Sequence, residues 1–223
     1  VGRPSKNRKE AALESQIYWI GMAGIVAFTV SAVLTVLPKG TNLFSASVFG
    51  IITAIGGGTV RDVILDVPVF WAVDLNYIWV SLGASLAVFI SQNFFTRKHI
   101  YSSILYLDGF GVALFAIEAA DKVWHLAFGR PLAPIILGIV TAIGGGLIRD
   151  VLAGRQTLLM GRELYAIPVL LGCTLYVALL ALLPAFRIYG AVVCCLCIFG
   201  LRAAAIHWDL SVPEWLAMKP KSG

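Results

Sequence analysis

Charged side chains are scarce in this chain of 223 residues. Asp, Glu, Lys and Arg make up 13% of the sequence, whereas 59% is hydrophobic and the mean hydropathy is +0.88. A soluble domain carries about 25% charged residues, which cover its water-facing surface. With half of that charge, most of the surface has to face lipid. The composition therefore predicts an integral membrane protein.

Residues that carry enzymatic or metal chemistry are also few. The sequence has no HExxH motif, no Ser/His/Asp set and no clustered metal ligands, and its three histidines fall at the ends of apolar stretches or between them. Its four cysteines lack zinc-site spacing and lie inside apolar runs, at Cys173, Cys194, Cys195 and Cys197. We therefore expect no enzyme, no cofactor and no bound metal, and interpret the cysteines as packing residues.

Apolar stretches indicate seven membrane-spanning helices. A span needs about 20 apolar residues, and strands of a membrane barrel would alternate apolar and polar residues, which these stretches do not. The predicted spans are residues 17–37, 43–65, 77–95, 100–119, 133–153, 164–183 and 188–206. The predicted fold class is thus an all-α integral membrane protein.

The two ends of the sequence are more polar. Residues 1–16 form a basic arm with Arg3, Lys6, Arg8 and Lys9, and have no cleavage site after an apolar run. A basic arm next to a span favours contact with anionic lipid over nucleic acid, because no nucleic-acid motif follows it. Residues 207–223, after the seventh helix at 186–206, carry Trp208 and Trp215 as expected interfacial anchors.

One segment occurs twice. Residues 53–58, Thr-Ala-Ile-Gly-Gly-Gly, recur as residues 141–146, and the Arg-Asp-Val of 61–63 recurs at 149–151. The repeat spans residues 17–95 and 105–183 and leaves the seventh helix unpaired. Because each copy has three spans, the second copy starts on the opposite side of the membrane. The sequence therefore predicts two inverted three-helix repeats, an architecture of many transporters and some channels.

Basic loop residues give only a weak indication of orientation. Assigned to alternate sides, the Lys and Arg residues divide equally between the two faces; without the first nine residues they favour the carboxyl-terminal side. By the positive-inside rule we expect a cytoplasmic carboxyl terminus.

The glycine triplets at 56–58 and 144–146 are unusual within a span. Each glycine costs about 1 kcal/mol in a helix relative to alanine, and the triplets leave the backbone uncovered. We interpret Gly56, Gly57, Gly58, Gly144, Gly145 and Gly146 as kinks or breaks in the second and fifth helices. The alternative is close packing of helices through small residues.

Charged pairs follow both triplets. Arg61 and Asp62 follow the first triplet, and Arg149 and Asp150 the second. Ionisable groups at membrane depth normally face the interior of the bundle. Because adjacent residues on a helix point apart, we expect Arg61 near Asp150, and Arg149 near Asp62. The alternative is that these charges reach the membrane surface.

Other polar residues fall near the same depth. Thr53 and Thr141 lie about one turn before the triplets and would add hydroxyl groups to a polar path. Asp108 and Glu118 occupy the fourth span, where their repeat partners, Ile20 and Val30, are apolar. This asymmetry makes both acids candidate pore or gate carboxylates, although Glu118 equally fits a helix end in water.

The doubled Gly-Gly-Gly-x-x-Arg-Asp-Val motif, residues 68–71 (Pro-Val-Phe-Trp) and residues 162–166 (Arg-Glu-Leu-Tyr-Ala) resemble the bacterial branch of the TRIC (trimeric intracellular cation) channels, also classed as a glycine-transporter-like family. The resemblance covers about residues 17–213. It implies a homotrimer in the bacterial inner membrane, a pore in each protomer at the glycine triplets of the second and fifth helices, and K⁺ as the permeant ion. The eukaryotic branch has a lysine in its fourth helix, whereas here Lys122 follows the predicted span.

Two functions therefore remain open from the sequence. The first is a potassium-permeable cation channel, and the second is a carrier of glycine or a similar small amino acid that uses the same helices. Expected partners are membrane lipid, a monovalent cation and further copies of the chain.

Overall fold

The computed structural model describes residues 8–92, 97–160 and 164–210, without the side chains of 8–14 and 97–99. In this part of the chain every long element is a helix. The elements are α1 (Arg8–Val36), α2 (Leu43–Ile64), α3 (Phe70–Val73), α4 (Asn76–Ile90), α5 (Arg97–His125), α6 (Leu132–Leu152), α7 (Ala166–Leu182) and α8 (Arg187–His207), with three short 3₁₀ turns.

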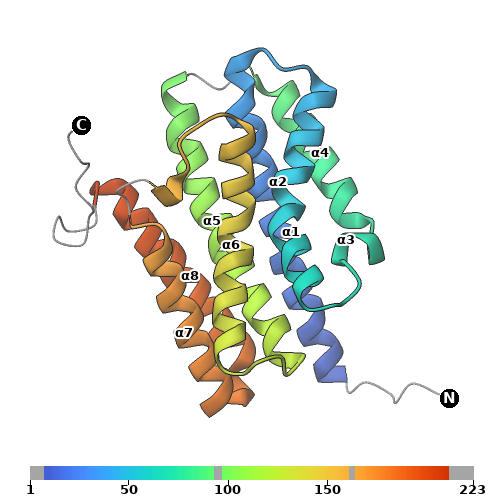
Figure 1. Cartoon of the computed structure of the whole chain (residues 1–223), viewed down its shortest axis with the longest axis vertical. Helices are drawn as coiled ribbons and strands as arrows, with labels where there is room; N and C mark the ends of the chain where they lie inside the picture. Colours follow the sequence, from blue (N-terminus) through green and yellow to red (C-terminus); the bar gives the residue numbers. More distant parts are fainter. Residues whose placement is uncertain (1–7, 93–96, 161–163, 211–223) are drawn as a thin grey trace.

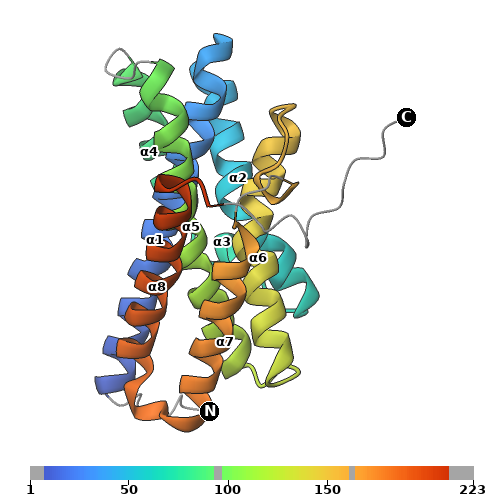
Figure 2. The same cartoon turned by 90° about the vertical axis from the view of Figure 1, so that its left-hand side faces the viewer.

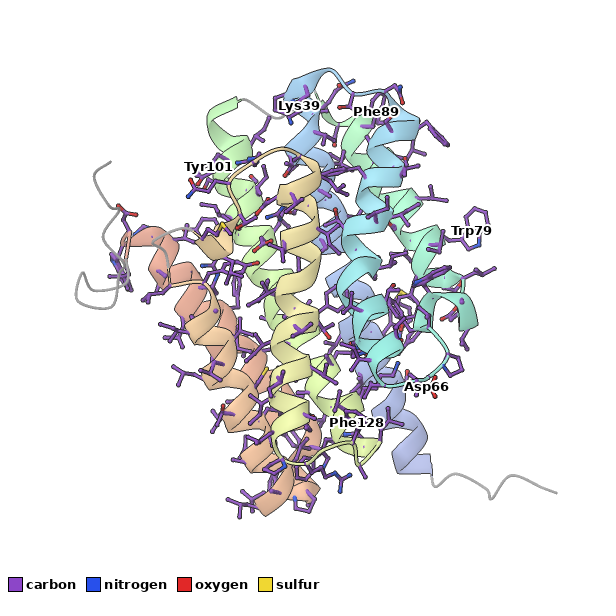
Figure 3. All side chains as sticks on the ribbon, in the orientation of Figure 1. Lys39, Asp66, Trp79, Phe89, Tyr101 and Phe128 are labelled. Atoms are coloured by element: carbon purple, nitrogen blue, oxygen red, sulfur yellow. The ribbon has the colours of Figure 1, made fainter. Side chains whose placement is uncertain are left out.

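Seven of these helices run up and down one bundle, with α3 as a short turn beside the end of α2 (Figures 1 and 2). Five are long and apolar enough to cross a membrane, and α4 and α7 are shorter apolar helices. Apolar side chains such as Trp79, which is 67% exposed, project outward from the bundle (Figure 3). The predicted fold class, an all-α membrane protein with two inverted three-helix repeats and a seventh helix, is confirmed.

Three boundaries differ from the predicted spans by five residues or more, and the first is the start of α1, at Arg8 rather than residue 17. The fourth span was expected to end at residue 119, but α5 continues to His125. It continues because Asp121 is buried and accepts hydrogen bonds from Tyr176 Oη (2.7 Å) and Arg187 Nε (2.7 Å), which join α5 to α7 and α8. The third span was expected to reach residue 95, but α4 ends at Ile90, and residues 93–96 lie outside the described residues.

The helices α2 and α6 end in the same turn, 88 residues apart. Val67 N donates to Asp62 O, and Arg155 N donates to Asp150 O. Between them, Asp66 (φ 53°) and Gly154 (φ 63°) adopt the left-handed conformation that closes a helix. Because α2 and α6 are antiparallel, these turns lie at opposite ends of the bundle. We call these the Asp66 end and the Lys39 end, after residues labelled in Figure 3.

The two glycine triplets bring the backbones of α2 and α6 into contact. A Cβ atom on Gly57 would overlap the carbonyl oxygen of Thr141, and one on Gly145 would lie 2.7 Å from the carbonyl oxygen of Thr53. On Gly144 it would lie 3.2 Å from the Gly57 Cα atom. Real Cβ atoms do not approach backbone this closely, so only glycine permits the crossing.

The glycine triplets do not break their helices, and the kinks that the sequence indicated as the other possibility stay a prediction. Both helices continue without interruption, α2 through residues 56–58 and α6 through residues 144–146. The alternative interpretation, close packing through small residues, agrees with the structure. Backbone contact between α2 and α6 compensates for the low helix propensity of glycine, so the triplets do not need to interrupt the helices.

We predict that Gly57→Ala lowers the free energy of unfolding by about 1–3 kcal/mol or more, because the added methyl group has to push α2 away from α6. Gly83→Ala is the matched control, since a Cβ atom there meets nothing within 4 Å. Thermal unfolding of both purified variants in detergent measures the difference. Equal stability of Gly57→Ala and Gly83→Ala would contradict the crossing.

Candidate functional site

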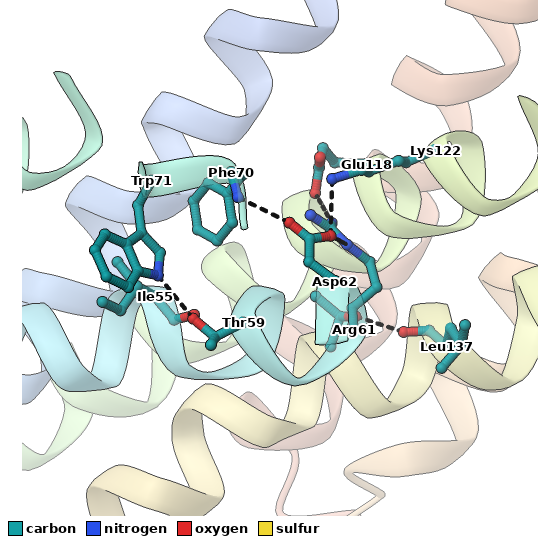
Figure 4. A network of polar contacts seen from close by, with 10 residues as sticks. Ile55, Thr59, Arg61, Asp62, Phe70, Trp71, Glu118, Lys122 and Leu137 are labelled. Atoms are coloured by element: carbon teal, nitrogen blue, oxygen red, sulfur yellow. Dashed lines mark hydrogen bonds and ion pairs between the residues drawn. The ribbon is translucent and has the colours of Figure 1, made fainter. Parts of the chain in front are cut away.

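Arg61 is the centre of a buried charged cluster at the end of α2. Its Nε atom donates to Asp62 Oδ1 (2.8 Å), and its Nη1 atom donates to Glu118 Oε2 on α5 (2.7 Å), as Figure 4 shows. Arg61 is 1% exposed and Asp62 is 0% exposed. A guanidinium at this depth is stabilised by the two carboxylates that it bonds.

Asp62 connects this cluster to two other elements. Its Oδ1 atom also accepts from Lys122 Nζ (2.7 Å), and its Oδ2 atom accepts from the backbone N of Phe70 (2.9 Å), at the start of α3 (Figure 4). Trp71 Nε1 donates to Thr59 Oγ1 (2.9 Å), which further holds α3 against α2. Asp62 therefore bonds two cations, whose second charge Glu118 balances, and anchors the start of α3.

Arg149 forms the corresponding cluster toward the Lys39 end. Its Nε atom donates to Asp150 Oδ1 (2.9 Å), and its Nη1 atom donates to Asp108 Oδ1 (2.7 Å) and to Ser31 Oγ (2.5 Å). Asp150 Oδ2 accepts from the backbone N of Leu158 (3.2 Å), the residue 88 positions after Phe70. Each Asp thus binds its neighbouring Arg and the backbone eight residues onward.

The expected exchange of partners between repeats is wrong. Arg61 pairs with Asp62 and Arg149 pairs with Asp150, because the long arginine side chain turns back so that Nε reaches the adjacent carboxylate. The alternative, in which these side chains reach outward to the membrane surface, does not agree with the structure, since Arg149 is 0% and Asp150 is 3% exposed. The interior location that the sequence predicted for these charges agrees with the structure.

Glu118 on α5 has a different counterpart in the first repeat from the one that the repeat spacing indicated. Arg61 donates to Glu118 on the first helix of the second repeat, and Arg149 donates to Ser31 on the first helix of the first repeat. The counterpart of Glu118 is therefore Ser31 rather than Val30. Glu118 also lies inside α5 rather than at its end. Helix α5 therefore supplies a carboxylate to both clusters.

Sequence reasoning missed Lys122 and Ser31. Lys122 follows Glu118 by four residues, which is the spacing of neighbours on one helix face, but the predicted span ended before it. Ser31 is a small polar residue within an apolar stretch, a pattern too common to single it out. Among the described residues, no group of three or more His, Cys, Asp or Glu side chains is placed to hold a metal ion.

The remaining predicted residues lie between the two clusters. Thr141 Oγ1 donates to Leu137 O in its own helix (2.6 Å), whereas the buried Thr53 Oγ1 has no hydrogen-bond partner among the described residues. A Cβ atom on Gly58 would lie 2.6 Å from the Phe70 ring, and one on Gly146 would lie 2.9 Å from Asp108 Oδ1. Gly56 faces Ile148, on the other helix of the crossing.

Comparisons with known proteins agree on one relationship. The family described as Glycine transporter matches residues 18–93 and 105–181. The UPF0126 inner membrane protein YadS of Escherichia coli is 33% identical over 206 residues, covering 89% of this chain and 96% of YadS. A UPF0126 membrane protein of Vibrio cholerae is 33% identical over 94% of this chain and 87% of its own length. A TRIC trimeric intracellular cation channel orthologue from Rhodobacter sphaeroides matches with a TM-score of 0.82 and 31% identity, covering 88% of this chain and all of that one.

Double-mutant cycles test which arginine and aspartate residues interact. We expect a coupling energy of about 1–3 kcal/mol between Arg149→Gln and Asp108→Asn, because their ion pair is fully buried. For Arg61→Gln and Asp150→Asn we expect additivity within about 0.5 kcal/mol, since the two residues lie in different clusters. Unfolding free energies of the single and double variants in detergent supply both cycles. Strong coupling between Arg61 and Asp150 would show that the pairing described above is incorrect.

Proposed function

Since the chain belongs to the bacterial TRIC channel family, also described as Glycine transporter, we propose that it is a potassium-permeable monovalent cation channel with one pore in each protomer. The observation that carries this proposal is the pair of buried charged clusters, one on each side of the α2–α6 crossing. Charges at membrane depth are expensive and mark ion pathways. Asp108 and Glu118 are ten residues apart on α5, which is about 15 Å along the helix axis.

The proposed pore runs between α1, α2, α5 and α6, past the glycine triplets. At the triplets α2 and α6 touch through their backbones, with no side chain between Gly57 and Gly145, so the two helices have to bend or part there when the pore opens. Two buried polar atoms near this route, Thr53 Oγ1 and Arg149 Nη2, have no hydrogen-bond partner among the described residues. Unpaired buried polar atoms are costly, and water entering the route with an ion would supply their hydrogen-bond partners.

Carboxylates account for the proposed preference for cations. Asp62 and Glu118 lie on one side of the crossing, and Asp108 and Asp150 on the other. The Lys122 side chain is 29% exposed while its Nζ atom bonds Asp62, so a K⁺ ion entering from the Asp66 end is able to replace it. Asp62 would then exchange one monovalent cation for another, with little change in local charge.

Membrane insertion and assembly follow from the relatives. YadS is named an inner membrane protein, and the Rhodobacter protein is named a trimeric channel. We infer a homotrimer embedded in lipid of the bacterial inner membrane. We assign the Lys39 end, where α8 also ends, to the cytoplasm, because the basic loop residues favour that side once residues 1–9 are left out.

A glycine carrier is the second candidate function. The observation in its favour is Arg149, whose guanidinium is fully buried and has one amino group, Nη2, without a partner. Such a group suits the carboxylate of a zwitterion, and Asp108 is close enough to attract its ammonium group. The same residues would then hold a solute rather than let ions pass.

Planar-bilayer recordings and proteoliposome flux distinguish the two functions. We expect unitary K⁺ currents from the wild type and no saturable uptake of glycine. Glu118→Gln should reduce K⁺ flux about tenfold, because an uncompensated positive charge within about 10 Å of the route adds between 1 and 2 kcal/mol to the barrier at an effective dielectric constant of about 20.

Asp66→Asn is the matched control for Glu118→Gln. Asp66 is exposed at the same end, and asparagine tolerates its left-handed backbone. Its flux should equal that of the wild type. Saturable glycine uptake without unitary currents would reject the channel and favour the carrier.

A further inference from the structure

Two residue stripes of matching pattern face each other between the charged clusters. On each stripe the spacing is three, four and three residues, which places four residues on one helix face. The α5 stripe is Asp108, Gly111, Phe115 and Glu118, and the α1 stripe is Gly21, Gly24, Phe28 and Ser31. Each stripe thus has a glycine and a phenylalanine in its middle, and the α5 stripe has a carboxylate at both ends.

The two phenylalanine rings stack on each other and fill reciprocal notches. Their centroids are 5.3 Å apart, with an interplanar angle of 15°. A Cβ atom on Gly111 would lie 2.9 Å from the Phe28 ring, and one on Gly24 would lie 3.2 Å from the Phe115 ring. Both rings are buried, so the two glycines allow a tight apolar layer where α1 and α5 meet.

Each ring borders one charged cluster. Phe115 lines a cavity of about 10 Å³ together with Arg61 and Glu118, a volume that fits about one water molecule. Phe28 lies on the other side, within 3.6 Å of where a Cβ atom on Gly145 would be. The next residue, Gly146, faces Asp108 and Arg149 in the same way. The stacked rings therefore separate the Arg61 cluster from the Arg149 cluster.

We propose that the Phe28–Phe115 stack is the dry barrier that closes the pore midway between the two charged clusters. The two stacked rings offer an ion no polar group to bind, and apolar constrictions exclude water as well as ions. The glycine contact of α2 with α6 leaves no space beside the stack, so the two rings have to part before an ion crosses. This inference rests on the channel function proposed above and identifies the residues that close the channel.

Polar substitutions in the stack test the barrier. Phe115→Ser and Phe28→Ser should raise the basal K⁺ flux of the reconstituted full-length protein at least about tenfold, a factor that corresponds to about 1.4 kcal/mol. Phe115→Tyr adds one hydroxyl group to an intact ring and should raise the flux in the same direction. Phe115→Leu keeps the layer apolar and should raise the flux far less than Phe115→Ser does.

Phe110→Ser is the matched control on the same helix. Phe110 is 39% exposed and contacts Phe199 on α8, away from the stack. Its flux should equal that of the wild type. Size-exclusion chromatography and thermal unfolding confirm that each variant is folded, and the mild Phe115→Tyr change provides the test if a serine variant unfolds.

The outcomes separate the barrier from the proposed function. Wild-type flux in a folded Phe115→Tyr or Phe28→Ser variant overturns the barrier while the channel function stands. An equal increase from Phe115→Leu also overturns it, because loss of ring volume rather than wetting would then open the route. Absence of K⁺ flux from the wild type and every variant, together with saturable glycine uptake, overturns the channel function and the barrier with it.

Discussion

Backbone contact between α2 and α6 is the constraint on which the other features of the structure depend. Gly57 and Gly145 let the two antiparallel helices touch, and each arginine lies four residues, or one helical turn, beyond its crossing glycine. One turn is about 5.4 Å, and the two helices run in opposite directions. The crossing therefore carries Arg61 and Arg149 apart, toward opposite ends of the bundle. Two separate charged clusters, rather than one shared ion-pair network, follow directly from this geometry.

Helix α5 makes the two halves of the symmetric bundle chemically different. It provides Asp108 to Arg149 and Glu118 to Arg61, whereas α1 provides only a serine hydroxyl group. The Arg149 cluster is closed to solvent, and Asp108 and Arg149 are both fully buried. The Arg61 cluster includes Lys122 and is partly exposed. A shift of α5 along its axis would alter both clusters at once, so this helix is the mechanical link between the two ends.

Most of the fold could be predicted from the sequence, because lipid imposes its constraint residue by residue. Apolar stretch lengths gave the helices, and the duplicated Arg-Asp pairs indicated which charges are buried. The ion-pair partners of the two arginines were harder to predict. A buried arginine has to be neutralised, but the amino-acid sequence does not say which carboxylate does so. Asp62 was not expected to be the partner of Arg61, because adjacent residues on a helix point apart. That argument ignores the length of the arginine side chain, which reaches back to the neighbouring carboxylate. The glycine triplets were interpreted as breaks because the compensating contact, with Thr141 of another helix, is not visible locally.

Burial of these charges also bears on how the proposed channel could open. The ion pairs stabilise the structure, but one cation in them can be replaced by another. Every carboxylate in the clusters accepts at least one charged donor, so removing a partner outright would leave an expensive unpaired charge. Exchanging one monovalent cation for another at the same oxygen avoids that cost. In the proposed channel, Lys122 would take the place of a permeant ion at Asp62 while the Phe28–Phe115 stack is closed. On this proposal, the apolar layer in the middle controls passage, and cation exchange at the carboxylates keeps the local charge balanced.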